Sequence, residues 1–177
     1  MLSSHFHKKA GFTLVDLLIV VFILGIVGLA VIPEFHTMAA ASKLNEATAE
    51  LVDGLHYARN LAVHYQRPFG LYAVVEGNAF MVCDFQHRGD GSPHHDYDPP
   101  VAPFGVVLNP FDKKWYVKNL GSLHEGVSID SAPAGGGHII FYPDGHSNFL
   151  DSTFVLGLGA EQKTITVSGT TGRVSVN

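Results

Sequence analysis

The chain has 177 residues, enough for one ordinary domain and an extension but not for two full domains. Its formal charge is −5, and after residue 42 no basic cluster is larger than Lys113-Lys114, which argues against nucleic acid as a direct ligand. The single cysteine, Cys83, excludes an internal disulfide and the usual multi-cysteine metal sites. We expect it to be a small buried apolar residue in a strand.

The first predicted element is an apolar helix over residues 12–33, with Asp16 as its one charged residue. A helix of about 20 apolar residues spans the hydrocarbon core of a bilayer. Lys8 and Lys9 precede it, so the positive-inside rule predicts a cytoplasmic N-terminus and a C-terminal region on the outer side.

A secretory signal peptide is the competing interpretation of this segment. It would use the same two lysines and a cut after Ala39-Ala40-Ala41, which offers the required small residues. Secretory apolar cores, however, run for about 7–15 residues, and this one is longer.

The stretch Lys8-Lys9-Ala10-Gly11-Phe12-Thr13-Leu14-Val15-Asp16 resembles the type IV prepilin signal. In that family a short basic leader ends in glycine, and the mature chain begins with phenylalanine and carries an acid at its fifth position. The resemblance implies a leader over residues 1–11, cleavage after Gly11 by a prepilin peptidase, and N-methylation of Phe12. The apolar helix would stay on the product, first as a membrane anchor and later in the core of a filament.

Asp16 stands where this family usually carries glutamate. A carboxylate at bilayer depth costs about 2.5–3.5 kcal/mol unless it finds a partner. The new α-amino group of Phe12, on the same or a neighbouring subunit, is a candidate partner, and such an ion pair would fix the register of subunits. Alternatively, Asp16 lies among the lipid headgroups and is simply solvated.

Three residues are expected to weaken this helix locally: Gly25, Gly28 and Pro33. Glycine costs about 1 kcal/mol and proline about 3 kcal/mol in a helix interior. Both residues are also common in transmembrane helices, but the proline falls where pilins commonly have one. The resemblance therefore implies a segment that can bend or melt in a filament.

An amphipathic helix is predicted over residues 34–67, ending near Gln66 because Pro68 blocks continuation. Its apolar residues recur every three or four positions and predict one buried face against a sheet. This face comprises Leu44, Ala47, Leu51, Leu55, Ala58, Ala62 and Tyr65, and the opposite face carries Glu46, Asp53, Asn60 and His64.

Residues 68–177 are predicted to form a β-rich globular domain, because short runs of β-branched and aromatic residues alternate with turn residues. The fold class is therefore α+β, with a long N-terminal helix packed on an antiparallel sheet. The predicted strands are 69–75, 79–85, 115–119, 127–130, 138–142, 147–150, 153–158, 164–167 and 173–176.

Three stretches, one near the end of the predicted helix and two in the C-terminal region, resemble the GspH/FimT-type minor pseudopilins and pilins, a subgroup with the type IV pilin fold. They are residues 58–62 (ARNLA), residues 140–145 (IFYPDG) and residues 171–174 (TGRV). We expect structural roles for them: Gly145 and Gly172 supply turn geometry, while Phe141 and Val174 supply core.

His87, His94 and His95 are candidates for a transition-metal site in the polar stretch 84–98, but a solvated loop explains them equally well. The carboxylates there do not have EF-hand spacing. No catalytic motif and no phosphate-binding loop is present in the sequence, so neither enzymatic activity nor a cofactor is expected.

The sequence thus predicts a minor pseudopilin or pilin, a structural subunit of a type II secretion pseudopilus or a type IV pilus. Its expected partners are other pilin-like subunits and the prepilin peptidase. Its expected location is the bacterial inner membrane, crossed once, with residues 34–177 in the periplasm before entry into a filament. The alternatives are a minor pilin that binds DNA during uptake, which the acidic balance disfavours, and an exported metal-binding protein.

Overall fold

The computed structural model describes residues 14–88, 104–133 and 137–177. These described residues fall into two compact units, which divide between Ala39 and Ala40. Helix α1 (Leu14–Tyr65) has residues in both units, and every β-strand lies in the second.

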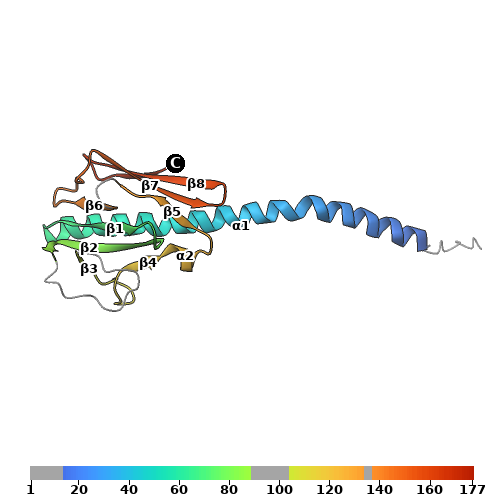
Figure 1. The fold of residues 1–177 in the computed structure, drawn as a ribbon, viewed down its shortest axis with the longest axis horizontal. Coiled ribbons are helices and arrows are strands. Elements are labelled where there is room, and N and C mark those ends of the chain that lie inside the picture. Colours follow the sequence, from blue (N-terminus) through green and yellow to red (C-terminus); the bar gives the residue numbers. More distant parts are fainter. Residues whose placement is uncertain (1–13, 89–103, 134–136) are drawn as a thin grey trace, which may run out of the picture. The chain divides into compact units, whose positions relative to one another are not determined.

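The second unit contains two antiparallel sheets rather than one (Figure 1). The larger sheet has the order β3-β2-β1-β6, with β4 pairing on β2 beside β3. The smaller sheet has the order β5-β7-β8-β9. The strands are β1 (Phe69–Val74), β2 (Ala79–Arg88), β3 (Phe104–Val106), β4 (Val117–Asn119), β5 (Ser128–Ser131), β6 (His138–Phe141), β7 (Asp151–Leu158), β8 (Glu161–Ser168) and β9 (Val174–Val176).

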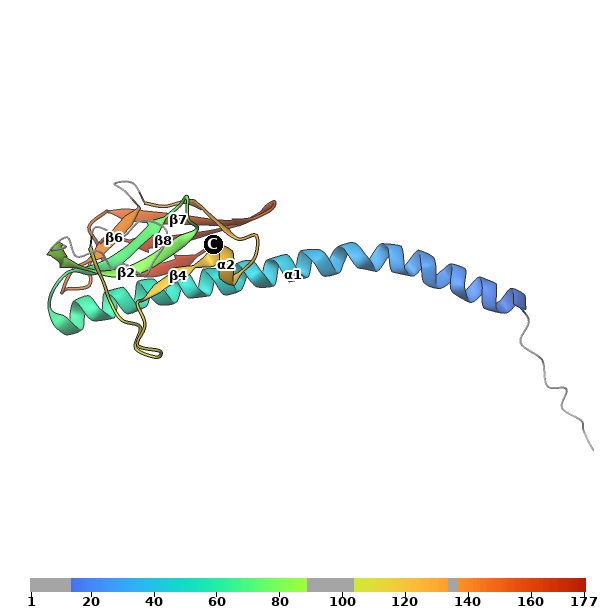
Figure 2. The ribbon, with the colours of Figure 1, turned by 60° about the horizontal axis from the view of Figure 1, so that its bottom comes forward.

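One core joins the second half of α1 to both sheets. Figure 2 shows this part of the helix running alongside the strands. The predicted apolar face supplies its helical side, since Leu44, Leu51 and Leu55 are at most 2% exposed. The three predicted alanines are fully buried, and Gly54 approaches so closely that an added Cβ would lie 2.7 Å from the Phe80 ring. Small residues therefore let this helix lie directly on the sheet, as their pattern predicts. The sheets contribute larger side chains, including Phe80, Phe141, Phe154, Ile129, Ile139 and Ile165.

Tyr65 does not belong to the buried face, which corrects the prediction. It is 57% exposed because α1 ends at this residue and Gln66 adopts a left-handed conformation, with φ of 53°. The NH of Arg67 then bonds to the carbonyl of Ala62, and Pro68 prevents further helix.

Residues 147–150 do not form the predicted strand. The NH of Asn148 donates to the Ile140 carbonyl, and the Asn148 side-chain oxygen accepts from the Ile140 NH. The Ser147 hydroxyl donates to the Phe149 carbonyl. Among these four residues, strand pairing is limited to a single antiparallel bridge between Ser147 and Phe141. Hydrogen bonds from the Asn148 and Ser147 side chains thus replace a regular sheet ladder over residues 147–150.

Two short elements were not predicted, namely β3 and helix α2 (Leu120–Leu123). Asn119 caps α2, its side-chain oxygen accepting from the NH of Ser122 at 2.9 Å. Cys83 lies fully buried in β2, as predicted, and burial raises the pKa of its thiol far above the usual range.

Candidate functional site

The first part of α1 exposes apolar side chains all round the helix. The large apolar residues from Leu14 to Val27 are between 44% and 79% exposed, although consecutive residues point in every direction about the axis. These residues are Leu14, Val15, Leu17, Leu18, Ile19, Val20, Val21, Phe22, Ile23, Leu24, Ile26 and Val27. A surface of this kind requires a lipid or protein cover.

The predicted processing and register residues cluster at the start of this segment. Gly11 and Phe12 lie outside the described residues, and Asp16 is the acidic residue in the first turn of α1. A Cβ added at Gly25 or Gly28 would meet nothing within 4 Å, and Pro33 falls within the bounds of α1. Within the described part of the chain, no helix combines the length and the apolar character needed to cross a membrane.

Arg59 brings together the three stretches that suggested the GspH/FimT subgroup. Its Nε donates to the Gly145 carbonyl at 3.3 Å, and its Nη2 donates to the Thr171 carbonyl at 3.1 Å. One guanidinium therefore links the late part of α1 to the 143–145 turn and to the 169–171 turn. Its forked geometry allows two carbonyls to be held at once.

Gly145 and Gly172 are required where these turns meet. Both have positive φ, 87° and 61°. A Cβ at Gly172 would collide with the carbonyl oxygen of Gly145 and would lie 2.9 Å from Arg59 Nε. The predicted structural roles are confirmed here, because the motif residues contact one another inside the fold.

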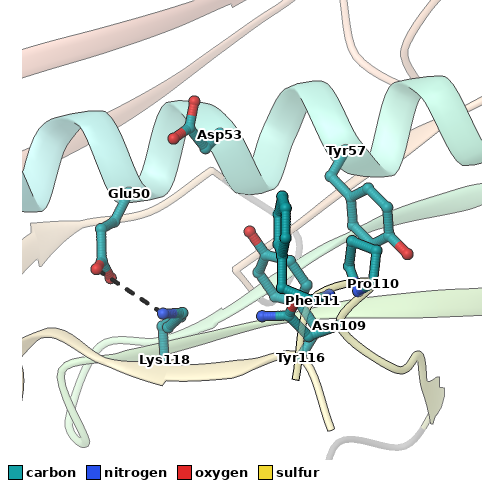
Figure 3. Close-up of a pocket in the computed structure, with 8 residues that line it drawn as sticks. All are labelled: Glu50, Asp53, Tyr57, Asn109, Pro110, Phe111, Tyr116 and Lys118. Atoms are coloured by element: carbon teal, nitrogen blue, oxygen red, sulfur yellow. Dashed lines mark hydrogen bonds and ion pairs between the residues drawn. The ribbon is translucent and has the colours of Figure 1, made fainter. Parts of the chain in front are cut away.

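A pocket of about 440 Å³ opens between α1 and the loop that follows β3 (Figure 3). Its walls combine two carboxylates and a lysine with three aromatic rings: Glu50, Asp53, Tyr57, Asn109, Pro110, Phe111, Tyr116 and Lys118. Tyr57 and Tyr116 stack with ring centroids 5.2 Å apart, and the Tyr57 hydroxyl donates to the Leu108 carbonyl at 3.2 Å.

The electrostatic balance of this pocket is negative. Lys118 Nζ lies 3.8 Å from Glu50 Oε1, so one cation faces two carboxylates. Burial, together with the charges of Asp53 and Glu50, raises the pKa of Tyr116 to about 12. Within the described part of the chain, the buried Oε2 of Glu50 has no hydrogen-bond partner.

The metal candidates are not brought together in the described structure. His87 lies in β2, with its side chain outside the description, and His94 and His95 lie outside it altogether. Over the residues described, no group of three or more His, Cys, Asp or Glu side chains is placed to hold a metal ion.

Comparison with known proteins supplies the family. The sequence profile described as Type II transport protein GspH matches residues 47–171, well over half of the chain. The chain belongs to the GspH family. Ahead of this match, the profile of the prokaryotic N-terminal methylation motif covers residues 6–32. No curated protein sequence matches the chain significantly.

Among solved structures, a minor pilin shares this fold. The type IV minor pilin FimU of Pseudomonas aeruginosa superimposes with a TM-score of 0.51 at 17% identity, covering 77% of this chain and 90% of that one. The minor pseudopilin EpsH from the type 2 secretion system of Vibrio cholerae matches with a TM-score of 0.45 at 16% identity, covering 78% of this chain and 95% of that one. At these identities the FimU likeness concerns the fold alone, which is the predicted type IV pilin fold.

Sequence reasoning did not find the pocket. It placed Asp53 correctly on the outward face of the helix, but Phe111 and Tyr116 lie in a stretch that matched no motif. The one available signal was the run of aromatic and turn-forming residues at 108–116, which is typical of a tight exposed loop.

Proposed function

We propose that this GspH-family chain is a minor pseudopilin or pilin, a structural and non-catalytic subunit of a filament. The filament is either a type II secretion pseudopilus or a type IV pilus. The exposed apolar segment of α1 carries this proposal. The C-terminal unit has a complete core of its own, so the large apolar residues of 14–27 are not needed to build it. They are available to lipid before assembly and to the helices of other subunits afterwards.

The N-terminal residues have the roles expected of a prepilin. A prepilin peptidase removes residues 1–11 after Gly11, and Phe12 is methylated; the match to the methylation motif supports both steps. Residues 12–33 anchor the subunit in the inner membrane in a single pass, and residues 34–177 lie in the periplasm. Removing Lys8 and Lys9 with the leader changes the formal charge from −5 to −7.

Asp16 then sets the register between subunits. It lies in the first turn of α1, close in sequence to the amino group that cleavage would create at Phe12. In a water-poor filament core an ion pair between these groups stabilises only the subunit stagger that brings them together. Gly25, Gly28 and Pro33 let the helix bend or melt locally as it passes from the bilayer into the filament.

The test is the intact mass and N-terminal sequence of the full chain, purified from cells with and without the prepilin peptidase. The proposal predicts a product that starts at Phe12 and is one methyl group heavier than the unmodified sequence, present only with the peptidase. A soluble product that starts at Ser42 in both strains would instead identify an ordinary secreted protein.

A further inference from the structure

The pocket between α1 and the 108–116 loop has the chemistry of a receptor for a positively charged group. From its geometry we infer that it binds a lysine or arginine side chain of a neighbouring filament subunit. This inference rests on the proposed function, which brings other subunits against this domain.

The loop that forms one wall is held in a fixed conformation. Leu108 and Trp115 form an antiparallel bridge, and the NH of Asn109 donates to the Lys114 carbonyl at 2.7 Å. Inside the loop, Asn109 Oδ1 accepts from the NH of Phe111 at 2.9 Å, and Lys113 has a φ of 57°. Phe111 is therefore presented at the tip by local hydrogen bonds, which lowers the ordering cost of binding.

The opposite wall supplies negative charge from a regular element. Glu50 and Asp53 are three residues apart on α1, and both line the pocket. Lys118 is at ion-pair distance from one oxygen of Glu50, and the other oxygen is buried without a hydrogen-bond partner among the described residues. Asp53 is the second carboxylate of the pocket and would attract a second cation, whereas an anion would meet two carboxylates.

The aromatic rings make the site selective for a cation on a long apolar stem. Figure 3 shows the Phe111 ring directed toward α1, between Asp53 and Tyr57. Tyr57 and Tyr116 stack beside it. Ring faces attract ammonium and guanidinium groups and also cover the methylenes of a lysine or arginine side chain. A pocket of about 440 Å³ is large enough for either one.

The exposure of Phe111 points to a protein as the source of that cation. Its side chain is 93% exposed, and Leu108 and Trp115 on the same loop are 48% and 41% exposed. A free small cation would leave these apolar surfaces in water. A neighbouring subunit that inserts its side chain into the pocket covers them at the same time.

The experiment uses the full chain in its own cells, with p-benzoyl-phenylalanine in place of Phe111 as a photocrosslinker. Irradiation of assembled filaments, followed by mass spectrometry, identifies the crosslinked peptide. We expect a pilin-like subunit crosslinked in a segment that carries a lysine or arginine. In the D53N background the adduct yield should fall about fivefold, the effect of losing one partly exposed ion pair.

Two matched variants and a charge swap complete the test. D53E should keep most of the adduct, and E125Q, which neutralises an exposed carboxylate outside the pocket, should leave it unchanged. D53R should lose the adduct and regain it when the identified cation of the partner is replaced by aspartate. Adducts on a segment without cations, or equal yields in D53N, would overturn the inference while the chain is still found in filaments. Absence of the chain from filaments would overturn the proposed function as well.

Discussion

Helix α1 uses its apolar residues in two different ways. Between residues 44 and 62 they form one stripe, and every member of it is buried in the core of the C-terminal unit. Between residues 14 and 27 they surround the helix and remain exposed. A one-sided stripe is sufficient for packing within a chain, whereas an apolar surface on all sides requires surroundings that the chain does not supply.

The comparison separates folding from assembly. The second half of α1 carries the small residues and the Arg59 links that fix it to the sheets, so changes there should affect the stability of the unit. The first half carries the exposed apolar residues of 14–27, so changes there should affect membrane insertion and filament entry. Matched substitutions in the two halves compare them directly, and substitutions at the turns show what fixes the second half.

Leu51→Ala should lower the free energy of unfolding of the C-terminal unit by about 2–5 kcal/mol, because it leaves a cavity in a fully buried site. Leu18→Ala removes the same atoms from a residue that is 63% exposed and should change that free energy by less than about 0.5 kcal/mol. Denaturant unfolding of the detergent-solubilised full chain, followed by the fluorescence of its single tryptophan, Trp115, measures both. Equal losses would contradict the division.

Gly172→Ala should cost about 2–4 kcal/mol, since the new Cβ collides with the Gly145 carbonyl as well as straining a positive φ. Gly159 provides the matched control, because its φ of 64° is nearly the same but an added Cβ meets nothing within 4 Å. Gly159→Ala should therefore cost only about 1 kcal/mol in the same unfolding assay. A similar cost for the two would show that backbone strain alone matters at Gly172.

Arg59→Ala should destabilise the unit by about 1–3 kcal/mol, because two carbonyls lose their charged donor. Arg59→Lys should recover only part of this, since an ammonium cannot reproduce the fork. Arg173→Ala is the control: among the contacts described, this exposed residue bonds only through its backbone NH and carbonyl. If Arg59→Lys were as stable as the native chain, charge rather than geometry would hold the turns.

The smallest effect concerns the exposed 143–145 turn. A hydrogen bond from His146 lowers the pKa of Asp144 below its ordinary value of 3.8. A carboxyl with a depressed folded-state pKa contributes stability above its unfolded pKa and loses it as the pH falls through the folded one. The melting temperature of D144N should therefore lie slightly below that of the native chain at pH 6, with the gap closing below about pH 4. A constant gap across this range would exclude the titration.

The sequence predicted the fold best where a single local property, helical spacing or glycine conformation, determines the structure. Helical spacing alone identified the buried stripe from Leu44 to Ala62, and glycine identified the turns at 145 and 172. It was wrong at Tyr65, where the helix ends, and at residues 147–150, where Asn148 bonds to Ile140 instead of extending a strand. Both errors come from hydrogen bonds that hydrophobic spacing does not encode.

The sequence could not predict the pocket for a related reason. Its walls come from α1, from the 108–116 loop and from β4, and only the folded chain brings Asp53 beside Phe111. The motif residues at Arg59, Gly145 and Gly172 were recognisable by resemblance, but the sequence did not indicate that one guanidinium joins them. The structure adds to the sequence pattern the contacts between residues that are far apart in the chain.

The account depends most directly on what covers the exposed half of α1. A photocrosslinker at Leu18 of the full chain, activated in cells with and without the other filament subunits, measures this. We expect crosslinks to the N-terminal helix of another pilin-like subunit, which disappear when those subunits are deleted. Crosslinks that remain unchanged in the deletion strain, or that join Leu18 only to proteins outside the filament, would contradict it.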